Sequence, residues 1–160
     1  MVARKIPQDT NYFHYYNANP KGKHVGDCLL RAISTALDIS WDDVLDGLVA
    51  IAHKTKQPPG EQTVFEKYLS QMGYVKVAQP KHPDGTKLTG EEFCELLDDA
   101  GIENDVLANI GAEHITVFVD MGGGFEHQCW DIWNCTKRKI GKVYMKKEDL
   151  GKWADIHQKL

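Results

Sequence analysis

The chain has 160 residues, of which 42% are hydrophobic and 26% charged, and its formal net charge is -4. This length is enough to bury the core of one domain, and the composition excludes a disordered chain and any general attraction for nucleic acid or an anionic membrane. Because no apolar run is long enough for a membrane helix and the first residues lack the apolar core of a signal peptide, we expect a single domain over residues 1–160 in the cytoplasm.

The first predicted elements are an N-terminal arm and a helix. The arm joins a cluster of aromatic side chains to the loop-forming stretch at residues 17–23, so we expect an irregular or single-strand segment that packs on the domain. A helix over about residues 28–38 follows, because large aliphatic side chains recur at helical spacing between Leu29 and Leu37. Asp27 is a suitable N-cap for this helix.

Three more helices are predicted in the middle of the chain. Ser40 and Thr89 are suitable N-caps, and each is followed three residues later by an acidic residue, as in a capping box. Prolines and a glycine at 58–60 stop the first of the three, and Gly101 closes the last. The elements expected here are helices over about 40–56, 63–72 and 89–100, and a short extended segment at 74–77.

After the last of these helices the pattern changes from helical to extended. Residues 114–120 are rich in β-branched and aromatic side chains, and the glycines at 122–124 mark a turn. A second strand over 125–133, a third over 140–145 and a terminal helix over 147–159 follow. Helices first and strands afterwards predict an α+β fold, in which N-terminal helices pack on a C-terminal antiparallel sheet.

Cys28 points most directly to a function. It lies in the first turn of a predicted helix, where unpaired N–H groups carry about half a positive charge and favour a thiolate over a thiol. We expect all the cysteines of this chain to be free thiols in a reducing cytosol. A thiolate with a histidine as its base is a common nucleophile, and His114 and Asp131 are the candidate partners.

The predicted hairpin brings His114 and Asp131 together. If Gly122 and Gly123 form a two-residue turn, His114 lies directly opposite Asp131, with Cβ atoms about 4.5–5.5 Å apart. The same register places Thr116 opposite Cys129 and Phe118 opposite His127. Asn134 is the alternative third member of the triad, although it points away from His114 if the strand continues straight. A three-residue turn would shift the register by one residue and weaken the preference for Asp131.

Acid–base chemistry then assigns the roles. The Cys28 thiolate attacks a carbonyl, His114 holds the proton and returns it to the leaving group, and Asp131 orients the imidazole and favours its charged form. The backbone N–H of Cys28 supplies one oxyanion donor. For a second donor in the preceding loop, Asn19 is the better candidate and His24 the weaker.

The remaining cysteines favour structural interpretations. Cys94 lies within the apolar stripe of a helix, which predicts a buried thiol. Cys129 and Cys135 with His127 lack the tight spacing of structural zinc ligands, so we expect no metal and no cofactor. The glycines at 122–124 indicate a turn and not a phosphate loop, because no helix follows them.

Several of these motifs also resemble a known family. Asn19-Pro-Lys-Gly-Lys, Gly26-Asp-Cys and Arg31-Ala-Ile, followed by a His-led strand and Trp130-Asp-Ile-Trp-Asn-Cys, resemble small papain-like proteins of bacterial and phage genomes over about residues 17–140. More distantly, the pattern is similar to the bacteriocin-processing cysteine peptidases. The resemblance implies a papain-like fold, with the nucleophile on the first long helix and the base on the sheet.

One position departs from the family pattern. Papain-like peptidases usually carry a glutamine shortly before the cysteine as an oxyanion donor, and Gly22 occupies that position here. The resemblance, together with Cys28, His114 and Asp131, implies a papain-like cysteine peptidase or amidase that cleaves a peptide or other amide bond in a peptide or protein substrate. The alternative is a catalytically weak or inactive module that binds a protein or peptide. Peptidase, amidase, transferase and deconjugating activities, and the oligomeric state, stay open.

Overall fold

The computed structural model describes residues 5–122 and 126–157. Within them, five α-helices and one six-stranded mixed sheet form the molecule, so the predicted α+β class is confirmed. No described helix combines the length and the hydropathy needed to cross a membrane. The elements in chain order are β1 (Phe13–Tyr15), α1 (Cys28–Leu37), α2 (Trp41–Thr55), α3 (Gln62–Gln71), β2 (Tyr74–Val77), α4 (Gly90–Ala100), β3 (Val106–Ile110), β4 (His114–Asp120), β5 (His127–Asp131), β6 (Ile140–Lys146), a 3₁₀ turn (Lys147–Asp149) and α5 (Leu150–His157).

The strand order of the sheet is β1-β5-β4-β3-β6-β2. All neighbouring strands are antiparallel except β1, which pairs in parallel with β5. The predicted antiparallel C-terminal sheet is therefore wrong in two respects: the sheet is mixed, and the N-terminal arm contributes its edge strand. The strand β3 was not predicted. Its five residues are almost all buried, and a short apolar run without alternation carries no clear period.

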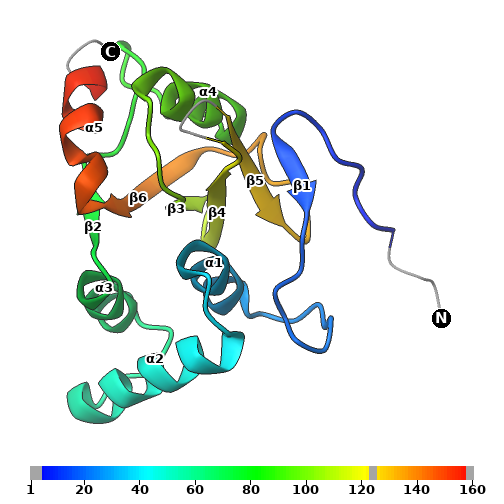
Figure 1. The fold of residues 1–160 in the computed structure, drawn as a ribbon, viewed down its shortest axis with the longest axis vertical. Helices are drawn as coiled ribbons and strands as arrows, with labels where there is room; N and C mark the ends of the chain where they lie inside the picture. Colours follow the sequence, from blue (N-terminus) through cyan, green and yellow to red (C-terminus); the bar gives the residue numbers. More distant parts are fainter. Residues whose placement is uncertain (1–4, 123–125, 158–160) are drawn as a thin grey trace.

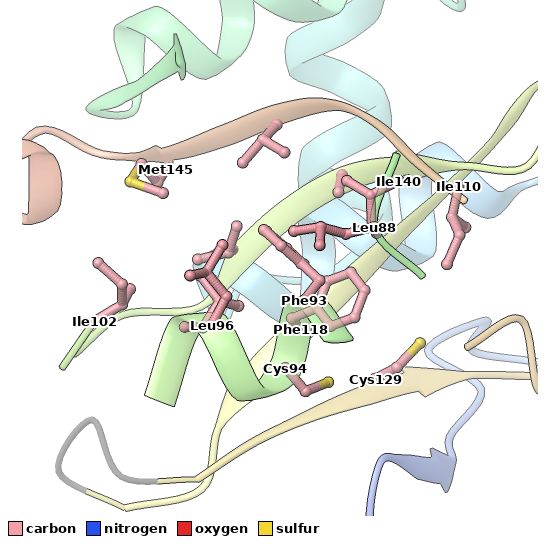
Figure 2. Close-up of a cluster of buried hydrophobic side chains, with 14 of the residues drawn as sticks. Leu88, Phe93, Cys94, Leu96, Ile102, Ile110, Phe118, Cys129, Ile140 and Met145 are labelled. Carbon is pink, nitrogen blue, oxygen red and sulfur yellow. The ribbon is translucent and has the colours of Figure 1, made fainter. Parts of the chain in front are cut away.

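Helices cover both faces of the sheet, with α1, α2 and α3 on one side and α4 and α5 on the other (Figure 1). Alternation along the strands divides the core between these sides. In β3, Val106 and Ala108 belong to the cluster under α4, whereas Leu107 packs with the α1–α3 cluster. Figure 2 shows the α4 side, where Phe93 and Phe118 pack edge to face with ring centroids 4.9 Å apart.

Caps that the sequence predicts are present at two helices. Ser40 accepts a hydrogen bond from the Asp43 N–H at the start of α2, and Thr89 forms a complete capping box with Glu92 at the start of α4. Gly101 ends α4 in the left-handed conformation, with φ of 69°. These local signals fix the start and the end of α4 where the sequence predicts them. The apolar residues of α4 then form part of the core on that face of the sheet.

The register of the β4–β5 hairpin differs from the prediction. Phe118 pairs with Cys129 and Asp120 with His127, which is a shift of two residues from the predicted pairing. The cause is a longer connection: the Met121 N–H donates to the Glu126 carbonyl oxygen at 2.7 Å, so the turn is not the two-residue turn assumed at Gly122 and Gly123. Gly123 and Gly124 lie outside the described residues. Because side chains alternate with a period of two, this shift keeps the predicted faces.

Candidate active site

The candidate active site lies at one end of the sheet, where α1 begins and packs against β4 (Figure 1). Cys28 is the first residue of α1. Asp27 occupies the predicted N-cap position, although its side chain accepts no hydrogen bond from the first turn of the helix. The Asp27 carboxylate instead accepts hydrogen bonds from Arg31, from Asn19 at 2.9 Å and from Trp41 at 3.0 Å. The first turn of α1, which begins at Cys28, therefore has no side-chain cap on its N–H groups.

Cys28 is half-buried, and its thiol interacts with the His114 ring and the Ile115 backbone. Burial disfavours the thiolate, but these interactions outweigh it and lower the pKa of Cys28 below the ordinary thiol value. The positive charges of His114 and Arg31 act in the same direction. The structure thus brings the predicted nucleophile and the predicted base into contact.

His114 begins β4 after a three-residue turn that Gly111 enters with φ of 70°, a conformation that favours glycine. The His114 Nε2 atom lies 2.6 Å from Oδ2 of Asp131, which leaves Nδ1 as the second ring nitrogen. The Trp133 ring lies 5.0 Å from the imidazole, centroid to centroid, and tilted against it. The backbone of β4 thus fixes the position of His114, and Asp131 and Trp133 hold its ring.

The electrostatics favour a protonated His114. Burial alone would lower its pKa, but hydrogen bonds to Asp131, Cys135 and Cys28 raise the pKa of His114 to about 11. The pKa of Cys28 and the pKa of His114 therefore move in opposite directions, as a thiolate–imidazolium pair requires.

Asp131 lies at the end of β5 and is 4% exposed. Its Oδ1 accepts a hydrogen bond of 2.7 Å from the Ile132 N–H, and Nη2 of Arg31 lies 3.4 Å away. Arg31 is itself buried and also donates to Asp27. This side chain ties the start of α1 to the carboxylate that holds His114. The sequence shows the Asp27–Arg31 spacing of one helical turn, but the contact with Asp131 depends on the tertiary fold, and the sequence analysis missed Arg31.

Cys135 is a second group that the sequence analysis missed at this site. Its side chain hydrogen-bonds with His114, and its sulfur lies 3.6 Å from the Cys129 sulfur. Hydrogen bonds from Cys129 and His114 lower the pKa of Cys135 against the effect of burial. Cys135 is fully buried, whereas Cys28 is half-buried and so is the thiol that a substrate can approach.

The same atoms are the ones that could hold a metal ion. Ligand atoms of His114, Asp131 and Cys135 lie within 4.8 Å of one another. An imidazole, a carboxylate and a thiolate are ligands that Zn²⁺ accepts. A cation there would compete with the proton shared by His114 and Asp131, and it would lie close to the positive charge of Arg31.

The other predicted site residues have different contacts. The Asn19 side chain donates to Asp27 and accepts hydrogen bonds from the Lys21 and Lys23 N–H groups, so it organises the loop before Cys28. Its role as an oxyanion donor stays a prediction. His24 pairs with the Tyr15 hydroxyl at 2.8 Å. Asn134, the alternative third member, accepts hydrogen bonds from the backbone N–H and the hydroxyl of Thr136.

Two more sequence predictions concern Cys94 and His127, which lie on the side of the sheet that α4 covers. Cys94 is 1% exposed, which confirms a buried thiol, and burial raises its pKa. His127 is also buried and binds Asp98 and the Asn104 carbonyl oxygen instead of facing Cys129 and Cys135 as a metal ligand would.

In comparisons with known proteins, no family model, no curated protein and no solved structure matches this chain. The function that follows therefore depends on the chemistry of the described residues. A half-exposed thiol in contact with an imidazole, which in turn binds a carboxylate, can form and break a thioester with a substrate carbonyl group.

Proposed function

We propose that this protein is a cysteine-dependent hydrolase that cleaves a peptide or other amide bond, with Cys28 as nucleophile, His114 as base and Asp131 as the orienting carboxylate. The observation that carries the proposal is the meeting of three groups: the Cys28 thiol at the start of α1 interacts with the His114 ring, and Nε2 of that ring lies 2.6 Å from Asp131. The lowered pKa of Cys28 and the raised pKa of His114 agree with it.

In the first half of the reaction, the Cys28 thiolate attacks the carbonyl carbon of the substrate amide. The negative charge on the carbonyl oxygen is stabilised by the Cys28 backbone N–H and the positive end of α1. The C–N bond then breaks, and the departing amine takes the proton of the His114 imidazolium. The products of this half are the free amine, a thioester on Cys28 and a neutral imidazole.

In the second half, water replaces the amine. Neutral His114 removes a proton from the water, and the resulting hydroxide attacks the thioester carbonyl. The C–S bond breaks, which releases the carboxylic acid and restores the thiolate–imidazolium pair. Asp131 keeps the ring orientation throughout and stabilises its charged form.

The same proposal includes a papain-like arrangement of the site. Three features support it: the nucleophile begins the first long helix, the histidine begins a central strand, and the carboxylate ends the neighbouring strand. Trp133, two residues after Asp131, packs against the His114 ring. Its indole excludes water from one side of the imidazole–carboxylate hydrogen bond.

Site-resolved labelling with iodoacetamide tests the proposal. We expect Cys28 to react at pH 6, well below the range where an ordinary thiol with pKa of about 8.5 ionises, and we expect the His114→Ala variant to lose this reactivity. His82→Ala is the matched control, because His82 also pairs with a carboxylate, Glu92, at 2.8 Å but lies on another part of the chain. An ordinary pKa for Cys28, together with no hydrolysis of a mixed peptide digest, would overturn the enzyme and favour the binding module.

A further inference from the structure

Three side chains that can ligate a metal ion meet at the start of β4. They are His114, Asp131 and Cys135, and we call them the His-Asp-Cys cluster. Among the residues that the structure describes, this is the one place where three such groups converge. They come from the first residue of β4, the last residue of β5 and the segment between β5 and β6, so the tertiary fold assembles the cluster.

The cluster is not the zinc site that the sequence analysis considered. That site would have combined Cys129 and His127 with Cys135, but both ring nitrogens of His127 already have partners within the fold. In the structure Cys135 instead joins His114 and Asp131. Two of the three ligating groups are therefore the proposed base and the carboxylate that orients it, so an ion bound here acts directly on the candidate active site.

We propose that the His-Asp-Cys cluster binds a zinc ion through Nε2 of His114, the Asp131 carboxylate and the Cys135 thiolate, and that the bound ion switches hydrolysis off. The inhibitory half of this inference rests on the proposed function, because it takes His114 as the base for Cys28. The metal site itself depends only on its three ligands.

The donor set selects the kind of ion. Zn²⁺ accepts nitrogen, oxygen and sulfur ligands at about 2.0–2.3 Å, whereas Mg²⁺ and Ca²⁺ prefer oxygen ligands alone. Ligand atoms on a tetrahedral Zn²⁺ lie roughly 3.3–3.6 Å apart. In the cluster, Nε2 of His114 lies 2.6 Å from Oδ2 of Asp131, and no pair of ligand atoms is more than 4.8 Å apart. Shifts of about 1 Å or less would thus create zinc geometry.

Charge balance favours the exchange of protons for zinc at this buried position. With His114 protonated, Asp131 ionised and Cys135 as a thiol, the cluster has no net charge. Zinc binding breaks the Nε2–H bond of the imidazolium and the S–H bond of the thiol, and both protons pass to water. Because Zn²⁺ replaces two protons, no additional charge is buried. The nearby cation Arg31 is already paired with Asp27.

A zinc ion on Nε2 would leave His114 without a function in the reaction. The metal-bound imidazole keeps its remaining proton on Nδ1, so the ring has no free lone pair to accept a proton and no acidic proton for the leaving amine. The ion would not replace the thiol as a catalyst, because Asp131 is 4% exposed and Cys135 fully buried, away from an approaching substrate. Cys28 is not a ligand, and its half-buried thiol stays open.

Cobalt(II) is the spectroscopic probe, because a cysteine ligand gives Co²⁺ a charge-transfer absorption and Zn²⁺ then displaces it. After chelator treatment, we expect this absorption in wild type and in Cys28→Ala. Cys135→Ala should weaken Co²⁺ binding at least about 100-fold, since loss of an outer-shell partner alone costs about 10- to 100-fold. Asp131→Asn, which keeps the shape of the site, should weaken it at least about tenfold. Cys94→Ala is the matched control, because Cys94 is another buried thiol, and its spectrum should equal that of wild type.

Inhibition is measured on the same proteins. Zn²⁺ should stop the hydrolysis of a mixed peptide digest by wild type and by Cys94→Ala, and a chelator should restore it. Cys135→Ala should continue to hydrolyse the digest at a Zn²⁺ concentration that stops wild type. Because Cys28 does not ligate the ion, iodoacetamide should still label it completely in the zinc-bound protein.

The outcomes separate the metal site from the proposed function. Protection of Cys28 from iodoacetamide by Zn²⁺ would overturn the ligand set, and hydrolysis that requires Zn²⁺ would overturn the inhibitory role. No cobalt absorption, with fast iodoacetamide labelling at pH 6, would overturn the metal site and leave the proposed function intact. Cobalt absorption that depends on Cys135, with ordinary reactivity of Cys28 and no hydrolysis, would support the metal site and overturn the proposed function.

Discussion

Two histidine–carboxylate pairs lie on neighbouring strands, and the difference between them separates a candidate catalytic histidine from a structural one. His114 binds Asp131 through Nε2 at 2.6 Å, and His127 binds Asp98 through Nδ1 at 2.9 Å. The second nitrogen of His127 contacts the Asn104 carbonyl oxygen at 3.3 Å, so both ring nitrogens of His127 have partners within the fold. The His127 side chain is fully buried, whereas that of His114 is 16% exposed and contacts the Cys28 thiol.

A short histidine–carboxylate contact is therefore not by itself a mark of function. The chemical difference is the partner on the far side of the ring: a thiol that can ionise for His114, and a carbonyl oxygen that cannot for His127. Position adds to this, because His114 begins β4 beside the start of α1, whereas the His127 side chain, at the start of β5, binds Asp98 of α4.

The largest expected effect comes from exchanging alanine for each histidine in turn. His114→Ala removes the proton carrier, and we expect hydrolysis to fall by about 10⁴-fold or more, with no further loss in the Cys28→Ala/His114→Ala double variant. His127→Ala leaves Asp98 without its partner and should lower the free energy of unfolding by about 1–3 kcal/mol. Hydrolysis per folded molecule, measured by single-turnover kinetics below the unfolding temperature, should be unchanged in His127→Ala. Equal losses of hydrolysis in both would contradict the distinction.

The next effect concerns Arg31, the buried cation that joins α1 to the Asp131 carboxylate. Arg31→Met leaves Asp27 and Asp131 without their shared partner, and we expect a loss of about 3–5 kcal/mol in the free energy of unfolding, measured by urea titration. Lys152→Met is the control, because Lys152 forms an exposed pair with Glu103 at 3.1 Å, and such pairs contribute about 0–1 kcal/mol. If the two variants unfold at the same urea concentration, the buried network is not what holds α1 to β5.

Asp131→Asn changes the charge at the site but keeps its shape. Hydrogen bonding to Asp131 is the main cause that raises the pKa of His114 to about 11, so this variant should lower that pKa. The wild-type rate should rise as Cys28 ionises, below the ordinary thiol range, and fall only as His114 loses its proton near pH 11. In Asp131→Asn the alkaline fall should move to lower pH, and the maximal rate should drop by about 10²-fold or more.

The raised pKa of His114 also predicts how the stability of the fold depends on pH. A histidine whose pKa is raised by folding stabilises the protein fully below its unfolded value of about 6.5, and this contribution is lost as the pH rises through the folded value. Wild-type stability should therefore decline toward pH 11 by more than that of Asp131→Asn, as measured by urea titration at several pH values. A parallel decline in the two proteins would show that Asp131 does not set the pKa of His114.

Local signals explain which parts of this structure the sequence could predict. The start of α1 at Cys28 and the bounds of β4 follow from helical spacing and from a run of β-branched residues, and both lie where predicted. The hairpin register was wrong by two residues because it depends on the length of the turn, and a glycine-rich stretch does not specify that length. His114 and Asp131 still meet, because a shift of two residues preserves the face.

The groups around the predicted residues could not be found in this way. The contact between Arg31 and Asp131 joins residues 100 positions apart, and that of Cys135 with His114 depends on the path of the chain after β5. Neither contact has a local period or a spacing that marks it. Asp27 shows the same limit, because its N-cap position was predicted but its side chain turns to Arg31 and Trp41 instead.

The smallest expected effect distinguishes two buried cysteines. Cys135 hydrogen-bonds with His114 and helps to raise the pKa of that histidine, whereas Cys94 packs in the α4 core (Figure 2). Cys135→Ala should lower the pH of the alkaline fall and reduce the rate by a few fold, while Cys94→Ala should leave the pH profile unchanged. Both variants lose a small buried group, so both should be less stable by about 1 kcal/mol. The pH profile, and not stability, is thus the measurement that separates a group acting on His114 from one that only fills the core. Superimposable profiles for the two variants would assign Cys135 to packing alone.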